Sequence, residues 1–135
     1  MSKVIRIETE KTPTEVIQEI KKKATDFNFI IRDVFDMMTE FKEHGVEIEN
    51  EFEYYSVMLC NPKKAYKSIL ENPIRGAVLF PPKQVVVFKE KDKTIISYVA
   101  VEEKDVKELL PEDRSFQKGL FESCNNIIKL INDII

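Results

Sequence analysis

Residues 54–70, YYSVMLCNPKKAYKSIL, show a buried strand passing directly into a helix. In the first part of this stretch two sets of side chains alternate at every second residue, and both sets are at least half apolar, which is typical of a strand. Asn61 then offers a side-chain oxygen as helix N-cap, and Pro62 occupies the first helical position, where its missing N–H costs nothing. The sequence therefore predicts a strand over residues 52–60 and a helix over residues 61–72.

The predicted helix is amphipathic. Its apolar residues recur at intervals of three and four, which indicates one packing stripe made of Ala65, Tyr66, Ile69 and Leu70. The lysines between them, Lys63, Lys64 and Lys67, are expected to lie in water.

The string CNPKKAYKSIL at residues 60–70, followed by GAVLFP at 76–81 and a valine-rich strand, resembles the domain of unknown function 302 family. In that family a Cys-Asn-Pro-x-x-Ala helix start precedes an apolar segment ending Leu-Pro-Cys-Arg and a β-hairpin. The resemblance covers residues 14–101 and implies a TATA-binding-protein-like β-α-β-β-β-β-α arrangement with no established activity. This chain reads Phe80-Pro81-Pro82-Lys83 where the family has Leu-Pro-Cys-Arg, so a role resting on two paired cysteines is not implied here.

The remaining elements follow from periodicity and from cap and turn residues. We expect a short edge strand at residues 4–7, a helix opening at residues 12–14, a strand at 27–35, a short helix within 36–50, a hairpin of strands 83–88 and 94–101, and a long helix over 111–135. Antiparallel strands followed by a terminal helix predict one α+β domain over residues 1–135, with helices on one face of the sheet and an extra short helix after the third strand.

The other face of the sheet is expected to be too apolar for water. It would carry Tyr54, Ser56 and Met58, beside either Val86 and Phe88 or Ile95, Val99 and Val101. Because two-fold homodimers are the commonest oligomers, we expect self-association to cover this face.

Composition narrows the functional classes. The chain has 135 residues, with 21 basic against 24 acidic side chains and a net charge of −3, which gives no reason to expect a nucleic-acid or membrane partner. The N-terminus lacks a signal-peptide pattern and no segment approaches a membrane span, so we expect a cytoplasmic protein. Abundant lysine and glutamate with only three glycines favour a thermophilic source.

Two cysteines are candidates for chemistry. Cys60 stands just ahead of a helix N-terminus, where exposed N–H groups favour a reactive thiolate, although a buried, space-filling cysteine is the commoner case. Cys124 falls in the apolar stripe of the last helix and is expected to be core. Lys63, Lys83 and the neighbouring lysines could attract an anion to the Asn61 helix start, but an ordinary charged surface explains them as well.

Other classes of site find little support. His44 is the only histidine, which excludes a His-pair metal site, and a copper(I) site from Met37, Met38 and Cys60 has no Cys-x-x-Cys spacing behind it. The three glycines are isolated, so a Gly-rich phosphate loop is absent. An acid–base pair within the glutamates around His44 is ranked last; a solvated rim is the simpler interpretation of Glu40, Glu43, Glu47, Glu49, Glu51 and Glu53.

The sequence thus predicts a non-enzymatic cytoplasmic homodimer, without cofactor or metal, that binds a small molecule or a partner protein. The expected binding cleft lies at the Cys60-Asn61-Pro62 helix start, with Lys63 and Lys83 nearby. The alternative is a thiol-dependent redox or sulfur-carrying protein in which Cys60 is the active group.

Overall fold

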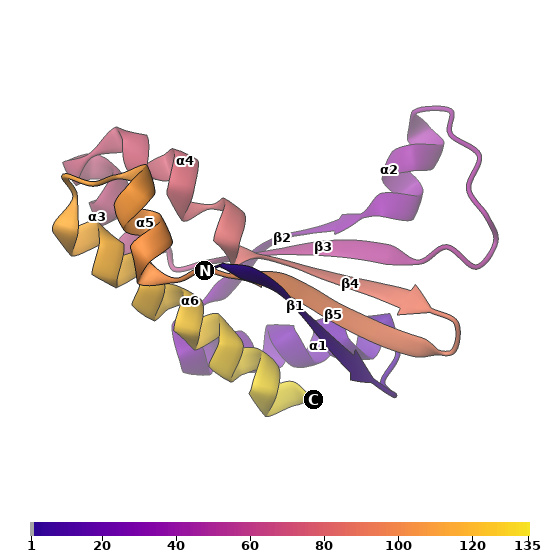
Figure 1. Ribbon diagram of the computed structural model, residues 1–135. Helices are drawn as coiled ribbons and strands as arrows, with labels where there is room; N and C mark the ends of the chain where they lie inside the picture. Colours follow the sequence, from indigo (N-terminus) through magenta and orange to yellow (C-terminus); the bar gives the residue numbers. More distant parts are fainter. Residues whose placement is uncertain (1) are drawn as a thin grey trace.

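Five antiparallel strands form one sheet, in the order β1-β5-β4-β3-β2 (Figure 1). The computed structural model describes residues 2–135. The strands are β1 (Lys3–Thr9), β2 (Ile30–Asp36), β3 (Tyr54–Cys60), β4 (Gln84–Glu90) and β5 (Lys93–Ala100). With a helix between the first two strands and a long helix at the end, the fold is the predicted α+β arrangement.

The helices divide into three groups (Figure 1). The α-helices are α1 (Pro13–Lys23), α2 (Met37–Glu43), α3 (Pro62–Glu71), α4 (Gly76–Leu79), α5 (Glu103–Leu109) and α6 (Arg114–Ile134), and short 3-10 turns are η1 (Ala24–Phe27), η2 (Pro73–Arg75) and η3 (Pro81–Lys83). Helices α1 and α6 lie side by side over one face of the sheet, α3, α4 and α5 gather at one end of it, and α2 stands off the opposite end.

The main core lies between the sheet and the pair α1 and α6. It takes alternate residues from the central strands and one stripe from each helix, and its fully buried members include Ile20, Val57, Leu59, Val85, Val87, Ile96, Leu130 and Ile131. Helix α1 buries Val16, Ile17 and Ile20 in this core, and Thr12 caps that helix by accepting a hydrogen bond at Oγ1 from the Glu15 amide at 3.2 Å.

The junction between β3 and α3 forms as predicted. Asn61 is the N-cap, and its Oδ1 accepts a hydrogen bond from the Lys64 amide at 3.2 Å, with Pro62 at the first helical position. The predicted packing stripe is wrong in part, because the side chains of Tyr66 and Leu70 are 69% and 68% exposed. Since α3 lies at the end of the sheet, it buries only a narrow face centred on Ala65.

Strand β2 begins later than predicted. Residues Ala24–Phe27 form the turn η1, and Asn28 then adopts a left-handed φ of 65°, which reverses the chain before Phe29 enters the core. Strand pairing starts at Ile30, and a register shift falls between Ile31 and Asp33. The period-two pattern that starts at Phe27 therefore combines a turn residue with a strand.

A second, smaller core lies at the end of the sheet. It consists of Ala65, Leu79, Val106, Phe116, Leu120 and Cys124, with half-buried neighbours that include Cys60 and Phe80. Helix α5 was not predicted, because only Val106 of its seven residues is buried and the segment gives no apolar period. The last helix accordingly starts at Arg114 rather than at residue 111.

The face of the sheet that turns away from α1 and α6 is called the open face below. Register pairs place Tyr54 beside Phe88, Phe88 beside Ile95, and Val86 beside Ser56 on this face, so members of both predicted sets share it. Val101 is an exception, because it lies beyond the end of β5 and packs against the second core. The rings of Tyr54 and Phe88 stack at a centroid distance of 5.2 Å. Val4, Phe35 and Val99 remain 70%, 43% and 43% exposed.

Candidate functional site

A cavity of about 390 Å³ lies between α3 and α6 and is called the α3–α6 cavity below. Its buried lining consists of Ala65, Arg75, Leu79, Lys83, Phe116, Leu120 and Ser123. Its exposed lining consists of Lys64, Lys67, Glu71, Ser115, Gly119 and Glu122, and the half-buried Ser68 lies between the two sets. Apolar walls with a few convergent polar groups are the usual make-up of a small-molecule site.

Small residues on α6 leave the space open. Ser115, Gly119 and Ser123 follow one another at intervals of four residues, so they share one face of the helix. A Cβ built at Gly119 would meet no heavy atom within 4 Å. The cavity therefore owes part of its width to side chains that α6 lacks on this face.

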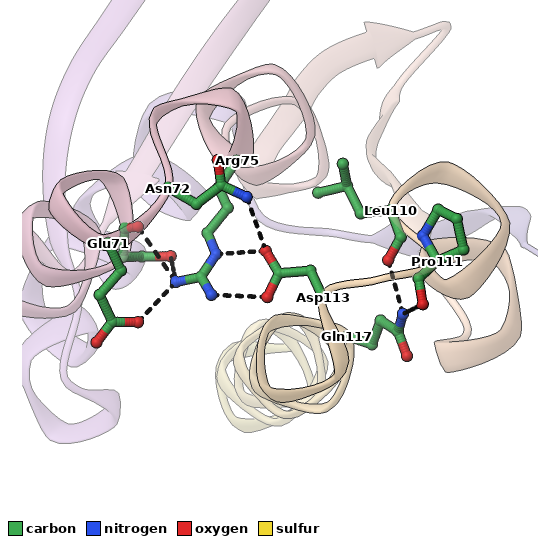
Figure 2. A network of polar contacts seen from close by, with 8 residues as sticks. Glu71, Asn72, Arg75, Leu110, Pro111, Asp113 and Gln117 are labelled. Atoms are coloured by element: carbon green, nitrogen blue, oxygen red, sulfur yellow. Dashed lines mark hydrogen bonds and ion pairs between the residues drawn. The ribbon is translucent and has the colours of Figure 1, made fainter.

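Arg75 fixes one end of the cavity (Figure 2). Its Nε and Nη2 donate to the two carboxylate oxygens of Asp113 at 2.7 Å each, and its Nη1 donates to Glu71 Oε2 at 2.9 Å and to the Ser68 carbonyl at 3.2 Å. These hydrogen bonds raise the pKa of Arg75 and lower that of Asp113. The guanidinium charge is thus neutralised inside the chain.

Contacts of Arg75 and Gln117 hold the first turns of α6 in place. The guanidinium carbon of Arg75 lies 5.3 Å from the centroid of the Phe116 ring. Gln117 Nε2 donates to the carbonyl oxygens of Leu110 at 2.7 Å and Pro111 at 3.3 Å, which ties the first turn of α6 to the loop after α5 (Figure 2). Both walls of the cavity are therefore held by contacts that do not involve Lys83.

Lys83 is the buried cation of the cavity. Its residue is 3% exposed, and it stands at the end of η3, a turn that contacts β3, β5 and α6. No oxygen or sulfur atom within residues 2–135 forms a hydrogen bond or ion pair with its Nζ. The fully enclosed side-chain nitrogen and oxygen atoms of the described chain all have partners, so the unpaired Nζ is not fully enclosed, and Lys83 is one of the residues that line the cavity.

The surroundings of Lys83 disfavour its charge. Burial lowers the pKa of Lys83, and the nearby Lys64 lowers it further, while Cys124 and Cys60 act in the opposite direction. A buried ammonium without a counter-charge costs free energy, and that cost falls when an anion binds beside it. The cavity is therefore suited to a negatively charged guest.

Cys124 is a member of the second core and Cys60 packs against it. Both are free thiols. Cys124 is 4% exposed, and burial raises the pKa of its thiol to about 11, so it stays protonated at neutral pH. Cys60 is half-buried at the last position of β3.

The structure separates the residues predicted for the binding cleft. Of the five, Lys83 lines the α3–α6 cavity, whereas Cys60, Asn61, Pro62 and Lys63 do not. Asn61 is occupied as the helix cap, and Pro62 and Lys63 are exposed. Sequence reasoning missed Arg75 and the α6 residues, although the four-residue spacing of small residues on α6 was a readable signal.

The residues considered for a metal or acid–base site lie outside the α3–α6 cavity. Met38 accepts a hydrogen bond from the Tyr54 amide at 3.0 Å, so the methionines of α2 and Cys60 lie at opposite ends of β3. His44 is exposed at the end of α2, where its Nδ1 lies 2.9 Å from the Glu40 carbonyl. Within residues 2–135, no group of three or more His, Cys, Asp or Glu side chains is arranged to hold a metal ion.

A shallower hollow of about 500 Å³ lies beside η1 and the start of β2. Its polar lining side chains, Lys21, Thr25 and Asp33, are all exposed to solvent. It holds no buried charged group, so the α3–α6 cavity is the better candidate site.

Comparison with known proteins identifies relatives by sequence and by fold. Residues 5–119 match the family model described as domain of unknown function DUF302. A crystal structure of an uncharacterized conserved DUF302 protein from Bacillus stearothermophilus superposes with a TM-score of 0.68 at 18% sequence identity, over 97% of this chain and 94% of that one. None of the curated proteins compared with the chain matches it significantly.

The length and apolar character of the helices decide whether any of them could cross a membrane. Across residues 2–135, none is both long and apolar enough to cross a bilayer.

Proposed function

This chain belongs to the DUF302 family, and we propose that it is a binding module for a small anionic molecule, which it holds in the α3–α6 cavity against Lys83. The observation that carries the proposal is a lysine that is 97% buried, unpaired and in contact with an open cavity. Such a charge is costly in the empty protein, and a bound anion would offset the cost.

The charges around the cavity support an anion over a cation. Because Asp113 neutralises Arg75, the lining leaves Lys64, Lys67 and Lys83 against Glu71 and Glu122, an excess of one positive charge. Lys64 and Lys83 repel each other, so an anion placed between them would relieve that repulsion as well. Ser68, Ser115 and Ser123 supply hydroxyl groups that can orient it.

Calorimetric titration with inorganic phosphate tests the proposal. Wild-type protein is expected to bind phosphate, and Lys83→Met is expected to weaken binding by about tenfold or more, because a charge-assisted hydrogen bond is lost. Lys22→Met removes an exposed lysine of α1 and serves as the matched control. Equal affinity in Lys83→Met and Lys22→Met, or no binding by wild-type protein, would reject the proposal.

Gly119→Leu provides an independent test that keeps Lys83. The new side chain would project into open space that borders the cavity, and leucine is a better helix former than glycine. We expect Gly119→Leu to fold normally and to lose phosphate binding, while Gly119→Ala keeps most of it.

A thiol-dependent role for Cys60 is the alternative function. It is supported by the position of Cys60, which is half-buried at the last position of β3, directly before the start of α3 and near Lys83. Alkylation with iodoacetamide at neutral pH tests it. Native Cys60 should react faster than the same cysteine in unfolded protein, and slower reaction would count against a thiol role.

The open face of the sheet supports a further proposal, the association of two copies of this chain. Arg6 pairs with Glu8 at 2.8 Å and with Glu90 at 2.6 Å, and Lys93 lies 3.7 Å from Glu8, so these two positive and two negative charges offset each other within one chain. Two open faces can therefore meet through Val4, Phe35 and Val99 without bringing together unpaired charges.

Sedimentation at micromolar concentration tests this association. Wild-type protein should sediment as a dimer and Val99→Lys as a monomer, while Val46→Lys should remain dimeric. Val46 is an equally exposed valine in the loop after α2 and so controls for the added charge. A monomeric wild-type protein would contradict the proposal.

A further inference from the structure

Lys83 presents a primary amine in a position where an amine can react. Most lysines of this chain are exposed and carry a hydrated ammonium group, whereas the Lys83 residue is 3% exposed and its Nζ has no oxygen or sulfur partner within residues 2–135. The groups that face it from neighbouring elements are Lys64 of α3, Cys60 of β3 and Cys124 of α6. None of them is a carboxylate that would hold the proton on Nζ.

The lowered pKa of Lys83 also favours a reactive amine. Burial and Lys64 lower the pKa of Lys83, and the Cys124 thiol, protonated at neutral pH, brings no negative charge to oppose them. A larger fraction of Lys83 is therefore the neutral amine than for a solvated lysine, and only the neutral amine is a nucleophile.

The rest of the cavity matches a two-ended guest. Leu79, Phe116 and Leu120 form apolar walls that exclude water, while Lys64 and Lys67 give positive charge at the exposed lining. A molecule whose anionic group lies at the proposed site between Lys64 and Lys83 would keep a carbonyl group adjacent to that anionic group within reach of the Lys83 amine.

We propose that Lys83 forms a reversible imine with an aldehyde or keto group of a small anionic ligand in the α3–α6 cavity. This inference rests on the proposed anion site and adds the class of its ligand, an anionic carbonyl compound. The Nζ lone pair attacks the carbonyl carbon, the C=O π electrons move to oxygen, and proton transfer gives a carbinolamine. Loss of water then forms the C=N bond, and protonation of its nitrogen gives the iminium ion; hydrolysis reverses each step.

Reductive trapping with pyridoxal 5′-phosphate, an aldehyde that carries a phosphate, tests the proposal. Limited reagent and borohydride should give one adduct per chain, and peptide mapping should locate it on Lys83. Pyridoxal, which lacks the phosphate, should label Lys83 several-fold less. Lys83→Met should lose the adduct, while Lys22→Met, which removes an exposed lysine of α1 outside the cavity, should retain it.

The outcomes separate this inference from the anion site itself. Labelling spread over exposed lysines, with the Lys83 peptide unmodified or with equal labelling of Lys83→Met, would overturn the imine. If wild-type protein still binds phosphate by calorimetry, only the imine is rejected. If phosphate binding also fails, the anion site is rejected with it. Thermal unfolding of Lys83→Met confirms that the lost adduct does not reflect a lost fold.

Discussion

Arg75 holds both carboxylate oxygens of Asp113 at 2.7 Å, through Nε and Nη2, across the gap between η2 and the start of α6. The two side chains are 8% and 12% exposed, so this pair is shielded from water, whereas the second carboxylate on Arg75, that of Glu71, is 53% exposed. Loss of Asp113 should therefore destabilise the protein more than loss of Glu71.

Asp113→Ala should lower the free energy of unfolding by about 3 kcal/mol, because it leaves a buried guanidinium without its main partner. Glu71→Ala removes an exposed partner of the same group and should cost at most about 1 kcal/mol. Urea unfolding of the two variants measures the difference. Equal losses of unfolding free energy in the two variants would show that Asp113 is not the main partner of Arg75.

The same carboxylate should make stability depend on pH. Hydrogen bonding from Arg75 holds the pKa of Asp113 below its ordinary value of 3.8, so the unfolded chain binds more protons than the folded chain between the two values. The stabilisation is complete well above pH 3.8 and is lost as the pH falls through the folded-state pKa. Asp113→Asn cannot titrate, and it should lose less stability than wild type between about pH 5 and pH 3. The other carboxylates titrate in both proteins, so their effect cancels when the two are compared. If wild type and Asp113→Asn lose the same unfolding free energy over this pH range, Asp113 is not the group responsible.

Lys83 should also make stability rise with pH, but in this case because the charged form of the side chain destabilises the fold. Because its folded-state pKa lies below the ordinary 10.5, the unfolded chain binds more protons in the interval between them, and stability rises with pH there. Replacing the buried amine with a methionine of similar length should stabilise the protein at pH 7 by on the order of 1 kcal/mol. The advantage should shrink as the pH rises from the folded-state pKa of Lys83 toward 10.5. A less stable Lys83→Met would show that the lysine contributes to the fold and not to a ligand site.

Local signals in the sequence predicted the architecture well. The Asn61-Pro62 helix start, the Thr12 cap and the β4–β5 hairpin depend on residues adjacent in the chain, and the structure confirms each of them. The hairpin turn is tighter than expected, because strand pairing continues to Glu90 and Lys93.

The errors come from contacts that are distant in the chain. Tyr66 and Leu70 have helical spacing, but whether that face is covered depends on where α3 lies relative to the sheet. Helix α5 is fixed by packing against α6 rather than by an apolar period of its own.

The candidate site likewise combines a feature that was predicted from residues near one another in the chain with contacts between distant residues. Lys83 was predicted as a lysine near the Asn61 helix start, and the structure shows that it is buried. No sequence pattern could show that Asp113, 38 residues away, would neutralise Arg75 and leave Lys83 as the unpaired buried cation. The cavity itself is formed by α3 and α6, which meet only in the folded chain.

Titration of the Lys83 side chain by heteronuclear NMR, with and without inorganic phosphate, shows whether this buried lysine is the anion-binding group. We expect the pKa of Lys83 to lie below its ordinary value of 10.5 in the free protein and to rise when phosphate binds, because the anion stabilises the ammonium form. A Lys83 that titrates at its ordinary value and does not respond to phosphate would contradict the proposed anion site.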